Sequence, residues 1–370
     1  MRFGFCVPVF ANPGAAFFRT PAWTRLDPPA AIESAVEAER LGYDSIWVAD
    51  HLIHGYDGGI LEGWTTLSVI AGRTRRVQLG TIHLAQPFRA PSLVAKMAAT
   101  LDALSGGRLI LFYDCGWNET EVRAYGLPWI DEAERIAQMD EGLRLIDVLW
   151  CAEAPLDFQG RFFTTAGAIC RPKPVSLPGR PRPPIWLGEA RHDAWLDVVC
   201  RHADGWNSTP ASPARLAAKL ERLRAACQRA GRDPATLELS LELQVLIAPS
   251  EEAVRESVRR IAALPASVRG RPRDDLLAWA SGNDPRPLAM LAPDWLAGTP
   301  EQVTTQLEAS IGLGISHFLL WFLDFPSLAG MRLFAECVAP AIRARWPAGS
   351  GDGALRRGGG APDPASIGTG

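Results

Sequence analysis

One stretch of this sequence decides its fold: Asp44-Ser45-Ile46-Trp47-Val48-Ala49-Asp50-His51. Three consecutive large apolar residues follow a helical pattern over residues 29–41, so we expect a short parallel strand that is buried on both faces. The strand ends on an acid, Asp50, and an imidazole, His51. Side chains just past the carboxyl ends of parallel strands line the ligand crevice, and histidine changes charge near neutral pH. A helix N-cap beside a half-exposed loop residue fits the same pair, so both interpretations stay open here.

The composition narrows the class of protein. The chain has 370 residues, of which 47% are hydrophobic, and a formal net charge of -3. It contains no apolar stretch long enough to cross a bilayer and no signal sequence at its start, so we expect a cytoplasmic protein without membrane contact. The charges are interspersed, which argues against nucleic-acid binding and favours a small-molecule partner. The 7 cysteines show neither metal-ligand spacing nor a disulfide framework, so we expect reduced thiols and no metal.

Strand-like and helix-like segments alternate from residue 1 to about residue 345. Strands are predicted at residues 3–8, 45–48, 77–84, 109–113, 185–188, 205–207, 237–247 and 316–323. Eight successive strand and helix units imply parallel strands joined by right-handed crossovers, and they predict a (β/α)8 TIM barrel. A doubly wound sheet is the alternative, but no Gly-x-Gly-x-x-Gly motif follows the first strand.

We expect one domain over residues 1–346, with two insertions. The first insertion, about residues 155–183, contains two short aromatic or β-branched runs separated by Gln159-Gly160-Arg161, which predicts a hairpin. The second, about residues 265–293, predicts a long loop with a helical piece, and such loops are commonly lids. The tail, residues 347–370, is nearly all Gly, Pro, Ala, Ser, Asp and Arg, so we expect it to be disordered.

Several segments together resemble the luciferase-like family of flavin-dependent oxidoreductases, whose members use FMN or a deazaflavin coenzyme. The matching segments, in the order of the family, are residues 42–51, 79–84, 105–109, 116–119, 171–174, 184–188, 202–207, 298–303 and 317–321. The resemblance covers essentially everything before the tail. It implies a luciferase-like TIM barrel with the flavin or deazaflavin at its carboxyl face, which agrees with the count of strands and helices.

The resemblance also implies which residues hold the cofactor ring. Thr81, Ile82 and His83 leave the third strand where the family packs the ring, often with an unusual cis peptide bond. The Asn118 amide, both donor and acceptor, would reach the ring edge, and Trp206 is expected at the same site. Asn118 would alternatively cap the following turn, and Trp206 would be core.

The cofactor phosphate is expected after the fifth strand, at Gly188, Glu189, Ala190 and Arg191. Gly188 opens a helix, so its loop can offer backbone N–H groups to a phosphate, and Arg191 can pair with that phosphate. Glu189 replaces the glycine and serine of many relatives. Bacterial luciferases carry an acid in this region, which favours FMN over deazaflavin.

The predicted catalytic residues are His51, Asp50 and His83. His51 would handle a substrate proton, while Asp50 would either orient it or face away into the following turn. A lone imidazole in a barrel strand is often a core group, but His83 lies beside the expected ring.

The expected function is a monooxygenase reaction, in which reduced FMN from a separate flavin reductase meets oxygen and one oxygen atom enters a small organic substrate. The alternative is a dehydrogenase or reductase that uses the deazaflavin coenzyme. A flavin-binding protein without turnover is the third possibility, because Phe112-Tyr113 crowds the barrel mouth. A homodimer is compatible with each of these interpretations.

Overall fold

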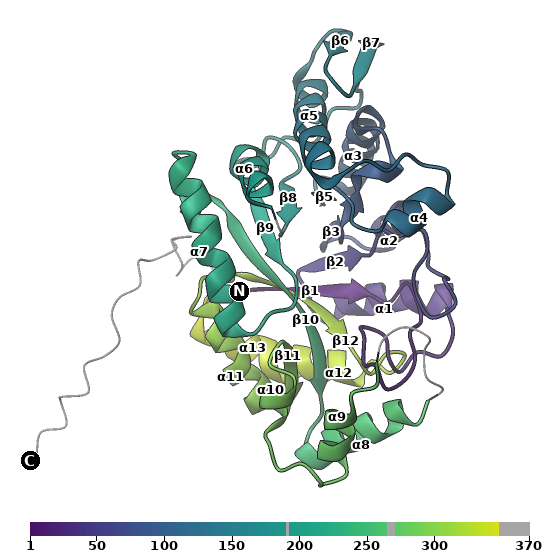
Figure 1. The fold of residues 1–370 in the computed structure, drawn as a ribbon, viewed down its shortest axis with the longest axis vertical. Helices are drawn as coiled ribbons and strands as arrows, with labels where there is room; N and C mark the ends of the chain where they lie inside the picture. Colours follow the sequence, from purple (N-terminus) through teal and green to yellow (C-terminus); the bar gives the residue numbers. More distant parts are fainter. Residues whose placement is uncertain (190–191, 265–270, 348–370) are drawn as a thin grey trace, which may run out of the picture.

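Eight parallel strands close into a barrel in the computed structural model, which describes residues 1–189, 192–264 and 271–347 (Figure 1). The barrel strands are β1 (Arg2–Val7), β2 (Ser45–Val48), β3 (Gln78–Thr81), β5 (Leu109–Asp114), β8 (Ile185–Gly188), β9 (Gly205–Ser208), β10 (Glu238–Ile247) and β12 (His317–Phe322). Around the ring the order is β10, β12, β1, β2, β3, β5, β8 and β9, and β9 pairs with β10 to close it. The predicted TIM barrel is confirmed.

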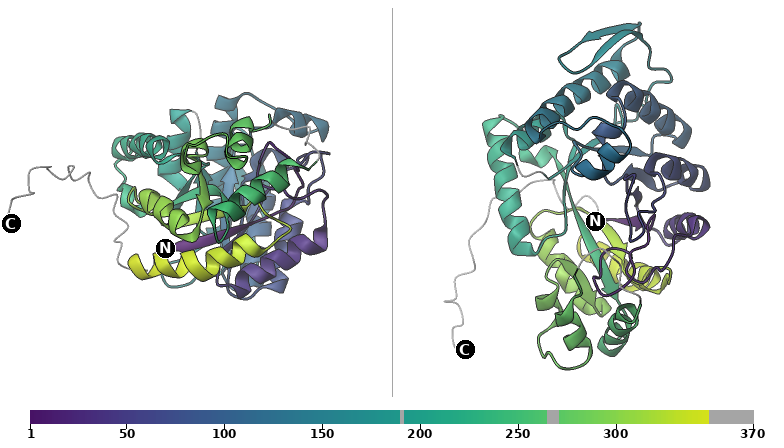
Figure 2. Two further views of the ribbon diagram at one scale, coloured as in Figure 1. Left: turned by 90° about the horizontal axis from the view of Figure 1, so that it is seen from below. Right: turned by 45° about the vertical axis from the view of Figure 1, so that its right-hand side comes forward.

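Helices lie around the outside of these strands (Figure 2). They are α1 (Pro28–Arg40), α2 (Gly63–Arg73), α3 (Pro91–Ser105), α4 (Glu119–Ala124), α5 (Glu132–Cys151), α6 (Asp193–His202), α7 (Pro213–Arg229), α8 (Glu251–Ala262), α9 (Asp274–Ala280), α10 (Leu288–Leu291), α11 (Pro300–Ile311), α12 (Ala329–Leu333) and α13 (Ala339–Arg345). Helix α1 begins where Asp27 accepts the Ala30 N–H, and it buries Ala31, Ala35 and Ala38 on one face. Within the described residues no helix could span a bilayer.

Tryptophan rings fill the interior of the barrel, and glycines on neighbouring strands make room for them. Trp47 of β2 stacks on Trp186 of β8, with ring centroids 5.1 Å apart. Gly80 is the register partner of Trp47, and a Cβ at Gly80 would collide with that ring. Gly205 stands in the same relation to Trp186. These rings fill the barrel below its carboxyl end, and ligands of this fold bind at the loops above that end.

The strand prediction differs from the structure in two places. The expected strand at residues 77–84 is divided, because β3 ends at Thr81, a cis peptide bond joins Ile82 to His83, and β4 (Leu84–Ala85) then pairs with β5. An additional strand, β11 (Trp295–Gly298), pairs with the end of β10. Strand β10 is ten residues long and its pairing with β9 ends at Leu241, so the remainder of that edge is free to pair with β11.

The expected insertions contain regular structure. Strands β6 (Leu156–Gln159) and β7 (Thr164–Ala168) form the predicted hairpin, at the top of Figure 1. Glu141 of α5 accepts the backbone N–H groups of Arg161, Phe162 and Phe163 and so fixes its turn. Helices α9 and α10 lie within the second insertion, of which residues 265–270 are outside the described residues. Residues 348–370 of the tail are also outside them.

Candidate functional site

A cavity of about 610 Å³ opens at the carboxyl end of the barrel. Its volume lies within the range of small-molecule and cofactor sites, roughly 300–1,000 Å³. The segments that follow β1, β2, β3, β5, β8 and β9 contribute to its wall, together with α4, α5, α6 and α7. Apolar residues such as Ile82, Phe88 and Trp195 alternate with charged ones. Ligands of TIM-barrel enzymes bind at this face, so we take the cavity as the candidate active site.

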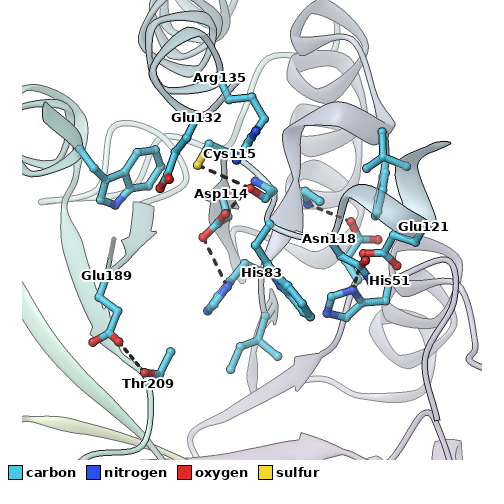
Figure 3. A pocket seen from close by; sticks show the side chains of 18 of the residues that line it. His51, His83, Asp114, Cys115, Asn118, Glu121, Glu132, Arg135, Glu189 and Thr209 are labelled. Carbon is cyan, nitrogen blue, oxygen red and sulfur yellow. Dashed lines mark hydrogen bonds and ion pairs between the residues drawn. The ribbon is translucent and has the colours of Figure 1, made fainter. Parts of the chain in front are cut away.

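His51 is held in this cavity by Glu121 of α4. Its Nδ1 lies 2.8 Å from Glu121 Oε1 (Figure 3). The second carboxylate oxygen of Glu121 accepts the backbone N–H groups of Leu52 at 3.0 Å and Ile53 at 3.3 Å. Burial alone would raise the pKa of Glu121, but these hydrogen bonds, first of all that with His51, lower it below its ordinary value. Glu121 is therefore a carboxylate, and its position is fixed by the loop that carries His51.

The pairing with Glu121 determines what His51 can do. A carboxylate on Nδ1 places the proton of the neutral imidazole on that nitrogen, which leaves the lone pair on Nε2. No described residue forms a hydrogen bond with Nε2 of His51, and the ring lines the cavity. The His54 ring stacks on the His51 ring at 4.8 Å, and the Trp117 ring meets it edge-on at 5.5 Å. This arrangement can accept a proton from a bound molecule and return it.

Asp50 makes a different set of contacts from those of His51. Its two oxygens bind the Arg89 guanidinium at 2.9 and 3.0 Å, and one also accepts the Ala85 N–H at 3.0 Å. Burial raises the pKa of Asp50, and Arg89 opposes that rise. The structure has neither of the two arrangements that the sequence left open for Asp50: it faces Arg89, and Glu121 is the carboxylate that contacts His51. Sequence reasoning missed Glu121, although it lies one helical turn after Asn118.

His83 lies at the same end of the barrel, beside Asp114. Its Nδ1 is 3.5 Å from Asp114 Oδ2, and its ring centroid is 4.3 Å from that of Phe112. Burial lowers the pKa of His83, and Asp114 opposes this decrease. Nε2 of His83 is buried and has no hydrogen-bond partner among the described residues. A buried polar atom without a partner at a cavity wall is suited to contact with a polar ligand.

Of the five residues expected to contact the cofactor ring, four line the cavity and Thr81 does not. The four are Ile82, His83, Asn118 and Trp206. Asn118 is the N-cap residue of α4 but forms no side-chain cap bond, so its amide is not used by the helix. Trp206 is buried, and its Nε1 has no described partner. Thr81 instead donates its hydroxyl to the Phe112 carbonyl at 3.2 Å, inside the barrel wall.

The loop expected to bind phosphate is described only in part. The Gly188 carbonyl accepts the Trp195 indole N–H at 2.6 Å. Glu189 lines the cavity and accepts the Thr209 hydroxyl at 2.5 Å (Figure 3). Its other carboxylate oxygen lies 2.5 Å from Lys219 Nζ. Ala190 and Arg191 lie outside the described residues, so their expected contact with phosphate stays a prediction. The carboxylate of Glu189 thus neutralises a lysine that sequence reasoning did not identify.

Arg135 of α5 is a second residue that sequence reasoning missed. Its side chain is buried beside the cavity, its guanidinium lies 3.8 Å above the Trp129 ring, and Nη1 donates to the Ile130 carbonyl at 2.5 Å. Nε is buried without a described partner, and the contacts of the guanidinium within the described residues are with a carbonyl and an aromatic ring, not with a carboxylate. A buried cation without a counter-ion is expensive unless a ligand supplies one. Arg135 could therefore hold an anionic group of a cofactor.

Among the described residues, no three His, Cys, Asp or Glu side chains gather in a geometry that could hold a metal ion. Cys115 lines the cavity, and burial raises the pKa of its thiol, so it is a thiol and not a thiolate nucleophile. The described residues of the site can transfer a proton through histidine.

Comparison with known proteins adds independent findings. A family model described as luciferase-like monooxygenase matches residues 1–317. An F420-dependent glucose-6-phosphate dehydrogenase of Nakamurella multipartita is 28% identical over 326 residues, which cover 86% of this chain and 93% of that protein. The enzyme of the same name from Rhodococcus erythropolis is 28% identical over 331 residues, which cover 86% of this chain and 94% of that protein.

Solved structures are similar at lower sequence identity. An F420-dependent secondary alcohol dehydrogenase in complex with an F420-acetone adduct is 21% identical, with a TM-score of 0.69, over 92% of this chain and 99% of that one. A long-chain alkane monooxygenase is 16% identical, with a TM-score of 0.73, and the match covers 93% of this chain and 91% of that one. At these identities the likeness shows the fold alone.

Proposed function

The chain belongs to the luciferase-like monooxygenase family, and from this premise we propose that it is an F420-dependent dehydrogenase or reductase of a small organic substrate. Members of the family are oxidoreductases. The two relatives that are 28% identical to this chain are named for F420, the deazaflavin coenzyme. This is the alternative of the sequence analysis. The FMN-dependent monooxygenase reaction is less well supported, because the monooxygenases among the similar structures share only the fold.

The fit of a deazaflavin rests on buried polar atoms at the cavity wall. Trp206 Nε1, His83 Nε2 and Arg135 Nε are all buried without a hydrogen-bond partner among the described residues. Native proteins leave few such atoms, so their gathering at one cavity supports a polar ligand there. Ile82 would supply an apolar contact for the ring, and Arg135 would pair with the phosphate. When bound, the deazaflavin would accept or donate a hydride.

The contacts of His51 carry the proposal, because they leave one nitrogen open to the cavity. In the dehydrogenase direction, Nε2 would accept the hydroxyl proton of an alcohol. The carbon that bears this hydroxyl would give a hydride to the oxidised coenzyme, and the alcohol would become a carbonyl compound. In the reductase direction, the protonated imidazole would return the proton to the carbonyl oxygen. The Glu121 carboxylate would stabilise the imidazolium in both directions, at 2.8 Å from Nδ1.

Titration of the protein with F420, FMN and riboflavin tests the proposal. We expect F420 to bind at least about tenfold more tightly than FMN. Arg135→Gln removes a charge-assisted contact worth roughly 1.5–3 kcal/mol, so F420 affinity should fall about tenfold to a hundredfold. Arg144→Gln, an exposed change on the same helix, is the matched control and should have no effect. Tighter binding of FMN, with oxygen uptake when reduced FMN is supplied, would instead support the monooxygenase.

A further inference from the structure

Arg19 lies in the long segment between β1 and α1, and several contacts fix it at the cavity. Its backbone N–H donates to Gln244 Oε1 at 2.5 Å, and its Nη2 lies 2.7 Å from Glu242 Oε1. The guanidinium sits 4.8 Å from the centre of the Trp321 ring and 5.1 Å from that of Phe18. The backbone of Arg19 has a φ of 54°, in the left-handed region that a non-glycine residue adopts only when its surroundings impose it.

These contacts leave part of the guanidinium unused. Arg19 lines the same cavity as His51 and His83. The ion pair with Glu242 uses Nη2, while Nε and Nη1 form no hydrogen bond with any described residue. An arginine that is held on one side and has open donors on the other is preorganised to bind an oxygen atom of a ligand, because its side chain is already ordered before binding.

The charges around Arg19 determine whether the ligand oxygen that it binds can belong to an anion. Glu242 is completely buried, and its Oε2 has no hydrogen-bond partner among the described residues. Arg19 and Glu242 together are neutral, so an anion at Arg19 would lie near a carboxylate that is already short of hydrogen bonds. Unlike charges stabilise each other strongly away from water, and like charges repel equally strongly. A hydroxyl or carbonyl oxygen can accept from Arg19 without that repulsion.

The other cations of the cavity point to the same conclusion. Lys219 is paired with Glu189 at 2.5 Å and Arg222 with Asp193 at 2.7 Å. Arg135 is the lining cation without a carboxylate among the described residues, and the proposed function assigns it to the coenzyme. Among the cations that the structure describes, those left for a substrate are already paired, so a phosphate ester would have to displace a carboxylate from one of them. This differs from what the relatives named for glucose 6-phosphate must bind.

We propose that the substrate is an uncharged alcohol or carbonyl compound, not a phosphate ester, and that Arg19 determines this specificity by donating a hydrogen bond to one of its oxygens. The inference rests on the proposed function, in which the substrate carbon exchanges a hydride with F420 and the substrate oxygen exchanges a proton with His51.

The first experiment measures F420 reduction by the full chain with glucose 6-phosphate, with glucose and with a panel of uncharged secondary alcohols, and F420 oxidation with the matching ketones. We expect the best uncharged compound to exceed glucose 6-phosphate in kcat/KM at least about tenfold. A preference for glucose 6-phosphate, or no turnover of any uncharged compound, overturns the inference. The F420 dissociation constant, measured on the same sample, distinguishes failure of this inference from failure of the proposed function. A protein that does not bind F420 contradicts the proposed function itself.

The second experiment tests the role of Arg19. Arg19→Gln alone would leave Glu242 buried without a counter-ion, because its remaining partner, the Trp321 indole N–H at 2.7 Å, carries no charge. The double variant Arg19→Gln/Glu242→Gln therefore keeps the site uncharged. We expect it to raise KM for the uncharged substrate about tenfold, with a smaller change in kcat and an unchanged F420 dissociation constant. Arg25→Gln, an exposed change in the same segment, is the matched control. An unchanged KM in the double variant contradicts the role of Arg19.

The third variant, Glu242→Gln, tests the charge argument from the other side. It leaves Arg19 as an uncompensated cation. Carboxylic acids with the carbon skeleton of the substrate should then inhibit at least about tenfold more tightly than they inhibit the wild type. Equal inhibition of the two proteins would show that Glu242 does not determine the exclusion of anions.

Discussion

The barrel carries a histidine paired with a glutamate at each of its two ends, and the pair at the carboxyl end lines the candidate active site whereas the pair at the amino end does not. At the carboxyl end, His51 Nδ1 binds Glu121 and Nε2 is open to the cavity. At the amino end, His317 Nδ1 lies 3.1 Å from Glu238 and Nε2 lies 2.7 Å from Ser45 Oγ. Both nitrogens of His317 are therefore occupied, and its side chain is completely buried.

The amino-end group contains the residue types of a serine nucleophile triad, yet its surroundings exclude that chemistry. The Ser45 hydroxyl also accepts the Trp47 indole N–H at 2.8 Å, and none of the three residues lines the cavity. A nucleophile must reach a substrate atom, and this hydroxyl is enclosed by the barrel. The comparison teaches that a hydrogen-bonded pair of this kind marks an active site only where one nitrogen remains open to a ligand.

Exchange of His51 should have the largest effect on the reaction. His51→Gln keeps a side chain that can form hydrogen bonds but cannot carry a proton near neutral pH. General acid–base catalysis contributes typically about 10²–10⁴-fold, so we expect kcat to fall at least about a hundredfold while the melting temperature and F420 affinity stay near their wild-type values. Steady-state kinetics and thermal melts check this. Wild-type kcat in the variant would make His51 a structural residue.

Exchange of His317 should produce the opposite result. His317→Gln breaks the hydrogen bonds with Glu238 and Ser45 in a buried site, which costs about 1–3 kcal/mol of unfolding free energy. The turnover of the folded protein should not change, because the pair is remote from the cavity. Urea denaturation gives the first quantity, and kcat below the unfolding transition gives the second. A loss of kcat without loss of stability would refute the division between the two ends.

Exchange of Glu121 should have a smaller effect than exchange of His51, because Glu121 acts through His51. Glu121→Gln removes the carboxylate that orients the imidazole, so kcat should fall about tenfold, with KM for the substrate nearly unchanged. Glu121→Asp should recover part of the loss. Glu119→Gln, on the exposed face of the same helix, is the matched control. Equal kcat values in the two glutamine variants would remove Glu121 from the site.

The amino-end pair also predicts a dependence of stability on pH. Burial lowers the pKa of His317 below its ordinary value of 6.5, so the unfolded chain binds this proton more readily than the folded one. The stabilisation is complete above about pH 6.5 and is lost as pH falls toward the folded pKa, by up to about 1.4 kcal/mol per pH unit. His317→Gln should make the decrease less steep. Denaturation curves of both proteins between about pH 5 and 8 give the unfolding free energy at each pH. An identical dependence on pH in the wild type and in His317→Gln would contradict this prediction.

The sequence was sufficient for the barrel and for the position of His51 at a strand end beside the cavity, and insufficient for the partners of His51. Regular spacing of apolar runs predicts the strands locally, and position at a strand end identifies His51. Glu121 follows 70 residues later, on a helix after another strand, and no local pattern joins the two. Arg135 presents the same difficulty, because its burial and its missing counter-ion arise only when α5 packs against the cavity. Strand β11 was missed because only the excess length of β10 provides its partner.

The most direct test of the account is a single-turnover measurement of the F420 half-reaction, made side by side on the wild type, His51→Gln and His317→Gln. At saturating F420 and substrate, and below the unfolding transition of all three proteins, we predict that His51→Gln slows the substrate-dependent absorbance change of F420 at least about a hundredfold. His317→Gln should react at the wild-type rate. A wild-type rate in His51→Gln, or equal slowing of both variants, would contradict the assignment of proton transfer to the carboxyl end of the barrel.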